Sequence, residues 1–140
     1  MIKSLTGEIL YLVEGKDRAA LIDTCLGVGH LKNLVEKLTD KPITVLLTHG
    51  HVDHAMGAPE FSEVYLNPKD IPLYQRQCPL EERKGYLAAG LGDTYTQIVE
   101  ESYVRPDKEY AFKELHDGMA FDLGGIHIDA YSFPGHTKGS

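Results

Sequence analysis

The first part of the chain alternates between short apolar runs and polar turns. Residues 9–13 form an apolar run rich in strand-forming residue types, and residues 18–23 contain a second one. Between them, residues 14–17 include a glycine and an aspartate, two residue types that favour turns. Two apolar runs joined by a short turn of this kind predict a β-hairpin.

The spacing of the apolar positions changes between residues 28 and 38. Four apolar residues fall there at positions i, i+3, i+4 and i+7, namely Leu31, Leu34, Val35 and Leu38. This spacing places them on one face of a helix, because an α-helix turns once every 3.6 residues. Lysine, asparagine and glutamate take the opposite face, so the segment is predicted to be an amphipathic helix.

Two further strands are predicted in the middle of the chain. Residues 43–47 are almost entirely apolar, which predicts a strand buried on both faces. Residues 63–66 predict a short strand, and Pro68 then favours the start of a helix that runs on toward residue 75. The first of these strands leads directly into the polar segment 48–54. Loops at strand ends are where α/β proteins place their chemistry.

The second half is predicted to be partly helical and then to return to strands. Residues 79–104 predict helix in part, and residues 119–123 and 126–133 predict strands separated by a Gly-Gly turn. The last strand is predicted to be half-buried and to end at residues 134–140. The middle region is rich in tyrosines, which either line a substrate pocket or pack between a helix and a sheet: Tyr74, Tyr86, Tyr95, Tyr103 and Tyr110.

Composition narrows the class of protein. The chain has 140 residues, of which 42% are hydrophobic and 25% charged, as in a globular domain with a single core. The net charge of -7 argues against a general nucleic-acid surface, but a small anionic substrate is compatible with it because a bound metal dominates its local field.

With no targeting segment and no apolar run long enough to span a bilayer, we expect a cytoplasmic protein without membrane contact. Cys25 and Cys78 are expected to be reduced thiols, since two cysteines provide no disulfide framework.

The polar segment after residue 47 carries the most specific chemical signal. His49, His51, Asp53 and His54 are four candidate metal ligands within six residues. At the end of a strand alternate side chains project to the same side, so His49 and His51 can converge on one ion. Gly50 between them lets the backbone turn tightly. Asp53 and His54 lie one turn further on and can point toward a second ion. We interpret the segment as a metal site rather than a chance cluster.

This segment resembles a known family. His-Gly-His-Val-Asp-His at residues 49–54 matches the HxHxDH motif of the metallo-β-lactamase superfamily. Residues 134–140 resemble its Gly-His-Thr-x-Gly-Ser loop, which supplies one more histidine, His136. Asp23 resembles the early aspartate that lies beneath the metal site in the family.

The resemblance implies a ligand set. His49, His51 and His136 would bind a first zinc ion, and Asp53 and His54 would bind a second. In the family a bridging aspartate and a final histidine complete the second site from sequence beyond the Gly-His-Thr-x-Gly-Ser loop, and this chain has neither. We therefore expect one zinc ion at the three histidines and a second that binds weakly or not at all.

The resemblance also implies a fold. It is an α/β (α+β) fold, a four-layer αβ/βα sandwich, of which residues 1–140 would form the N-terminal part as a single domain truncated at its C-terminus. A sheet that lacks its packing partner exposes apolar surface. The chain is therefore expected to be a fragment of a longer protein, or to form a homodimer that covers this face.

The activity implied is hydrolysis. Zinc would lower the pKa of a bound water molecule toward ~7, and Asp53, the catalytic residue, would orient the resulting hydroxide. The target is the carbonyl carbon of a small ester, thioester, lactone or amide, although the 140-residue form is expected to be weakly active or inactive. Two alternatives stay open. One is a di-iron redox protein of the same fold, although such proteins resemble HxExDH, with glutamate at the position of His51. The other is a non-catalytic metal-binding or structural module.

Overall fold

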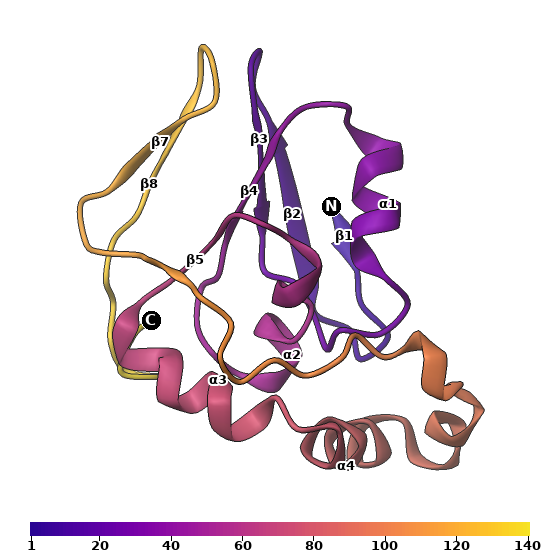
Figure 1. Cartoon of the computed structure of the whole chain (residues 1–140). Coiled ribbons are helices and arrows are strands. Elements are labelled where there is room, and N and C mark those ends of the chain that lie inside the picture. Colours follow the sequence, from indigo (N-terminus) through magenta and orange to yellow (C-terminus); the bar gives the residue numbers. More distant parts are fainter.

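A computed structural model describes residues 1–140 and shows a mixed α/β fold around a six-stranded sheet (Figure 1). The strands follow one another in sheet order as β1 (Ile2–Lys3), β2 (Ile9–Glu14), β3 (Ala19–Ile22), β4 (Ile43–Leu46), β5 (Val64–Leu66) and β6 (Lys113–Glu114). The first three pair antiparallel, and β3 to β6 pair parallel. The predicted hairpin and the two predicted middle strands are confirmed.

The helices pack mainly on one face of this sheet and along its lower edge (Figure 1). They are α1 (Leu31–Leu38), α2 (Val52–Ala55), α3 (Ile71–Gln77) and α4 (Leu80–Leu91), with 3-10 turns at Ala58–Glu60, Pro68–Asp70, Gly92–Gln97 and Glu100–Ser102. Leu21, Val45 and Val64 point from the sheet into the core that these helices cover. The helix predicted from Pro68 is confirmed as a 3-10 turn that continues into α3.

The expected apolar face of α1 is only half correct. Leu31 and Val35 are buried, but Leu34 and Leu38 are 44% and 54% exposed. The helix also begins later than the pattern predicts, because Gly29 and His30 both adopt positive φ angles, which an α-helix cannot contain. Two buried residues one turn apart are sufficient to attach a helix of eight residues to the core.

The last two strands form a separate antiparallel pair, β7 (Ala120–Asp122) and β8 (His127–Asp129). β8 is much shorter than the predicted strand over residues 126–133, because only three of its residues have a pairing partner. Leu123 of this hairpin is buried against Ala20 and Leu46, on the face of the sheet opposite α1. The hairpin is also held at the β2–β3 turn, where the amides of residues 16–18 donate to the carbonyls of residues 123 and 124.

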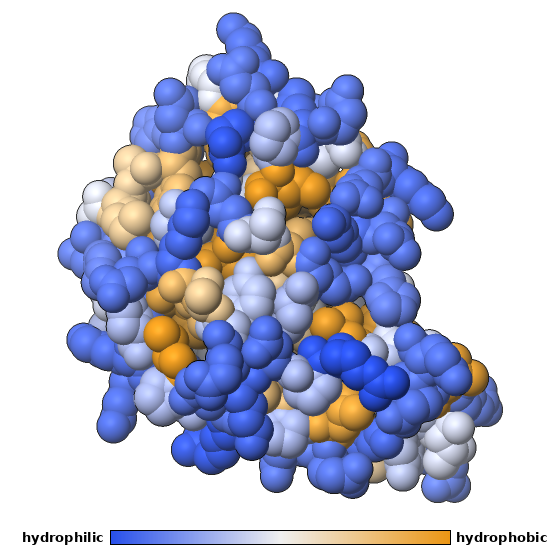
Figure 2. Space-filling view, in the orientation of Figure 1, coloured by the Kyte–Doolittle hydropathy of each residue, from blue (hydrophilic) through white to orange (hydrophobic).

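The face that the β7–β8 hairpin leaves open is partly apolar. Ile9 and Tyr11 of β2 are 44% and 53% exposed there. Figure 2 shows hydrophobic surface in separate patches bordered by hydrophilic residues rather than as one continuous area. The homodimer expected from such a face stays a prediction. No helix is long and apolar enough to cross a membrane.

Candidate metal centre

The candidate site lies where the parallel strands end. Asp23 follows β3, the segment with the predicted histidines follows β4, and the Pro68–Asp70 turn follows β5. Carboxyl ends of neighbouring parallel strands meet at one edge of a sheet, so these three segments are brought together by topology. The C-terminal segment returns to the same edge and ends beside the start of α3 (Figure 1).

Three histidines from two distant segments converge at this edge. One nitrogen atom each of His49, His51 and His136 lies within 4.8 Å of the other two. Nδ1 of His51 is 3.0 Å from Nε2 of His136, and Nε2 of His49 is buried without a hydrogen-bond partner. A buried nitrogen without a partner is costly, whereas a metal ion would satisfy all three rings. The predicted grouping of His136 with the motif histidines is therefore found in the structure.

Asp23 holds the motif in place from beneath. It is buried, has a φ of 65°, and accepts hydrogen bonds from the Thr48 amide at 2.8 Å and the Thr48 hydroxyl at 2.9 Å. Its Oδ2 also lies 2.8 Å from Nδ1 of His54. Oγ1 of Thr48 is in turn 2.9 Å from Nδ1 of His49. These contacts hold both rings through Nδ1, as in metal sites whose ligands are oriented by outer hydrogen bonds. Nε2 of His49 has no partner, and Nε2 of His54 faces Asp53.

Asp53 and His54 offer two further candidate metal ligands, one fewer than the three-histidine cluster. Nε2 of His54 lies 3.5 Å from Oδ2 of Asp53, and the His54 ring centroid is 4.1 Å from that of His49. Tyr86 of α4 donates its hydroxyl to the same Asp53 oxygen at 3.1 Å. Of the tyrosines in the middle region, Tyr86 therefore reaches the site, whereas Tyr74 and Tyr103 are buried in the core.

Asp70 is a component of the site that the sequence does not predict. Its side chain is buried, and its Oδ2 accepts hydrogen bonds from the Gly50 amide at 3.0 Å and the Thr137 hydroxyl at 2.7 Å. Its Oδ1 accepts from the Gly139 amide at 2.9 Å. Gly50 stands between two of the histidines, and Thr137 follows the third. Asp70 thus joins the two loops that supply the three rings.

Glycine is required on both sides of Asp70. A Cβ atom added at Gly50 would lie 2.7 Å from the Asp70 carbonyl oxygen, and one added at Gly139 would lie 2.8 Å from Cγ of Asp70. Real Cβ atoms do not come so close to other atoms, so only glycine lets both loops approach the carboxylate.

The environment of the rings keeps two of them neutral. Burial lowers the pKa of His49 to about 4, and the neighbouring His54 contributes. Burial and the nearby His136 also lower the pKa of His51. Burial acts against a charge on His54 too, but the hydrogen bond and the negative charge of Asp23 outweigh it and raise the pKa of His54. Since metal ligands must be unprotonated, His49 and His51 are ready to bind, while a proton competes for His54.

The lowered pKa of His49 predicts a fold that loses stability in acid. The unfolded chain protonates this ring near pH 6.5, whereas the folded protein does so only near pH 4. Between these values the unfolded state binds more protons, so stability falls as the pH is lowered from about 6.5 toward 4. We expect a loss of about 2 kcal/mol from this ring in metal-free protein, measured as the free energy of urea unfolding at pH 7 and pH 4.5.

The His49→Gln variant provides the comparison for this effect. His54 responds to pH in the opposite direction and is present in both proteins, so it cancels in the difference between them. The variant should lose less stability over the same pH range than the original protein does. An equal loss in the two proteins would contradict the assignment to His49.

Residues 10–140 match the sequence profile of the metallo-beta-lactamase superfamily. The chain belongs to this superfamily. An uncharacterized protein of Mycobacterium tuberculosis is 32% identical over 133 residues, which cover 87% of this chain and 52% of that protein. The human acyl-coenzyme A thioesterase MBLAC2 is 23% identical over 155 residues, with 94% and 51% covered. The chain therefore spans about half the length of the curated relatives it matches.

Solved structures of the superfamily share the fold. The structure of TTHA1623 in a di-iron-bound form matches 99% of this chain and 62% of its own, with 30% identity and a TM-score of 0.65. The expected fold class, part of a metallo-β-lactamase domain, is thereby confirmed. The structure brings together the three histidines that the motifs indicate, whereas the contacts of Asp70 and Thr48 emerge only from the folded arrangement.

Proposed function

We propose that the protein is a metal-dependent hydrolase in which His49, His51 and His136 hold one divalent ion, zinc. The observation that carries the proposal is the convergence of three ring nitrogens within 4.8 Å, one of them buried and unpartnered. Three histidines with an open fourth position are typical of catalytic rather than structural zinc sites. An ion held there supplies Lewis acidity, which makes water more acidic and polarises a carbonyl oxygen.

The roles proposed for the surrounding residues follow from their contacts. Thr48 and Asp23 orient the histidine rings through Nδ1. Asp53, whose Oδ2 accepts the Tyr86 hydroxyl, is the catalytic carboxylate that orients the attacking water and accepts its proton. With His54 it also offers two donors for a second ion. The pull of Asp23 on a proton at His54 makes that position the weaker of the two.

The proposed substrate is a small molecule with an activated carbonyl, and a thioester is the first choice within the ester, thioester, lactone and amide class. The relative MBLAC2, an acyl-coenzyme A thioesterase by name, supports this choice. Fold alone does not define a substrate, because one fold carries many activities.

We expect the purified chain, stripped with a chelator and reloaded, to retain one zinc ion per molecule after gel filtration. In this state it should hydrolyse an acyl thioester above the buffer rate, followed as release of free thiol, and the chelator should abolish the activity. If the protein retained no zinc ion, the proposed site would be rejected. One retained ion without hydrolysis would fit an inactive 140-residue form as well as the non-catalytic metal-binding module, and two retained ions would reject the weak second position.

A di-iron centre is the second candidate, and the di-iron-bound form of TTHA1623 is the observation that favours it. It would require Asp53 and His54 to hold the second iron. Metal content of protein expressed in iron-rich medium, together with an optical band of ferric iron, distinguishes the two. His51, where the redox proteins are expected to carry glutamate, favours zinc.

A further inference from the structure

A hollow of about 310 Å³ lies directly beside the three-histidine cluster. His51 and His136 form one side of it, and the first turns of α3 with the C-terminal loop form the rest. The hollow therefore opens onto two of the proposed metal ligands. Its other lining residues are mostly polar: Lys69, Asp70, Pro72, Leu73, Arg76, Thr137 and Lys138.

Three cationic side chains surround this hollow without anionic partners. Lys69 precedes α3, Arg76 lies within it, and Lys138 lies two residues after His136. All three are exposed, and none takes part in an ion pair, although the chain has 21 acidic residues to 14 basic ones. Gathering three unpaired cations at one place in an acidic protein creates a local positive field that the overall charge of -7 would not suggest.

Asp70 is the one carboxylate that lines the hollow, and its charge is already engaged. Both of its oxygens accept hydrogen bonds, from Gly50, Thr137 and Gly139. It is also buried, so it neither neutralises the three cations by direct contact nor offers a free acceptor to a ligand. The hollow therefore presents positive charge and hydrogen-bond donors to anything that enters it.

We propose that this hollow, defined by Lys69, Arg76 and Lys138, is an anion subsite that holds a phosphate group of the substrate while its acyl carbonyl lies at the metal. This inference rests on the proposed hydrolase function. Three positive charges suit a phosphate or diphosphate better than a single carboxylate, which one cation suffices to balance. The planar guanidinium of Arg76 matches phosphate oxygens in a bidentate manner, and the two lysines add point charges. The substrate class is thus a phosphate-bearing acyl thioester or ester.

The test measures binding to metal-free protein, so that the result does not depend on the metal site. Coenzyme A, which carries phosphates, is compared with pantetheine, which has the same thiol arm but no phosphate, by isothermal titration calorimetry. We expect coenzyme A to bind and pantetheine to bind about tenfold more weakly or not at all. Raising the salt concentration from about 50 to about 300 mM should weaken coenzyme A binding, because exposed charges are screened.

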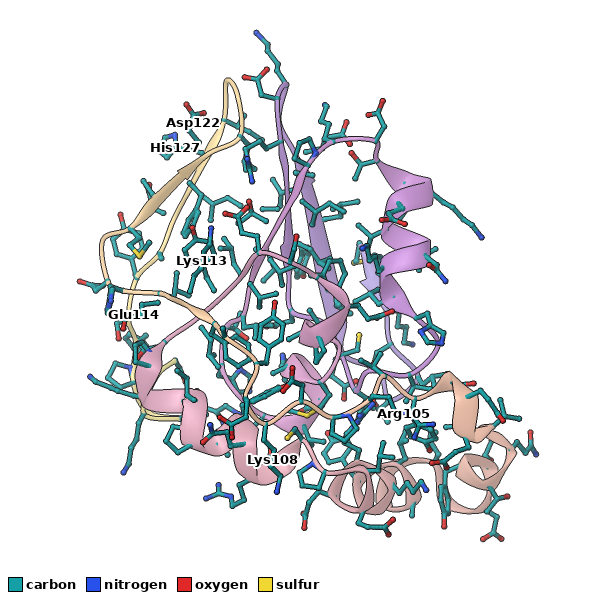
Figure 3. The ribbon with its side chains drawn as sticks, viewed as in Figure 1. Arg105, Lys108, Lys113, Glu114, Asp122 and His127 are labelled. Atoms are coloured by element: carbon teal, nitrogen blue, oxygen red, sulfur yellow. The ribbon has the colours of Figure 1, made fainter.

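The variant K69Q/R76Q/K138Q removes the three charges without touching a proposed metal ligand. Its affinity for coenzyme A should fall by about tenfold or more, while it retains zinc like the original protein. The matched control K3Q/K37Q/R105Q makes the same change in net charge at exposed positions outside the hollow and should bind normally. Figure 3 shows Arg105 on the connection after α4, away from the C-terminal loop.

Several results would overturn the proposal. The first is equal binding of coenzyme A and pantetheine, and the second is an equal loss of coenzyme A affinity in the two triple variants. The third is binding of inorganic pyrophosphate without binding of coenzyme A, which would indicate a site for free phosphate. Tighter binding of succinate than of pyrophosphate would assign the hollow to carboxylates instead. A protein that retains no zinc but binds coenzyme A through the three cations would reject the hydrolase function and leave the subsite standing.

Discussion

Replacing His51 by alanine is expected to weaken zinc binding about a hundredfold to a thousandfold. The structure offers three nitrogen donors within 4.8 Å, and the variant removes one of them. Zinc sites with four protein ligands bind with about 10–16 kcal/mol, so one ligand of several accounts for roughly 3–4 kcal/mol, or two to three powers of ten. Competition with a chromophoric chelator measures the change.

His127→Ala is the matched control for this substitution. His127 lies on β8, on the far hairpin away from the C-terminal loop (Figure 3), and its ring contacts only Asp129 among charged groups. The control should bind zinc as the original protein does. If the two variants weakened binding equally, or if His51→Ala left it unchanged, the three-histidine site would be wrong.

Replacing Asp70 by asparagine is the second change with a large expected effect, although the residue is not a proposed ligand. Its oxygens accept from three donors on the two loops that carry the histidines. An amide group places an N–H where one of these donors points, so at least one hydrogen bond is lost and two donors face each other. We expect zinc affinity to fall about 10- to 100-fold, the usual cost of disturbing groups that orient metal ligands.

Two further variants separate the effect of Asp70 on the position of the histidines from an effect on the stability of the fold. Glu63→Gln makes the same chemical change in a carboxylate that contacts Thr44, Arg18 and Lys113, on another part of the sheet. It should lower the free energy of unfolding but leave zinc affinity unchanged. Thr137→Val removes one Asp70 contact without altering the buried carboxylate and should weaken zinc binding to a smaller extent.

The visible spectrum of bound cobalt tests directly whether Asp70 positions the metal ligands. Cobalt in place of zinc reports ligand geometry, so displacement of His136 should alter its absorption bands in Asp70→Asn even at saturating metal. An unaltered spectrum together with unchanged affinity would show that Asp70 supports only the fold.

The strands were predictable from the sequence because their signals are local. Residues 43–47 are mostly buried by the sheet they join, and residues 9–13 pair along their length with β1 and β3, so both apolar runs indicate strands directly. The length of β8 was not predictable, since pairing depends on a neighbouring strand. Ala130 still exchanges backbone hydrogen bonds with Gly118 and Met119, but residues 131–133 pair with no strand. The burial of Leu34 was overestimated for a related reason. Helical spacing indicates which residues share a face, but not whether the neighbouring elements are wide enough to cover that face.

The candidate site shows the same division between local and distant information. His49, His51 and His54 lie in one short motif, and His136 is found through a second motif. Asp70 has no motif of its own, because its role arises from contacts with residues 20 and 67 or more positions away. One signal was available: Asp70 follows a predicted strand that neighbours β4, and side chains after adjacent parallel strands share one edge.

The distance in sequence between the histidines has a consequence for chain entropy. His51 and His136 are 85 residues apart, and β5, β6, α3, α4 and the β7–β8 hairpin lie between them. An ion bound to both would close this segment into a loop, and a covalent link around a loop of similar length restricts the unfolded chain by about 4 kcal/mol. The proposed ion would thus act as a reversible cross-link between the loop that follows β4 and the C-terminal segment. Release of the C-terminal segment and release of the ion would then be one cooperative event.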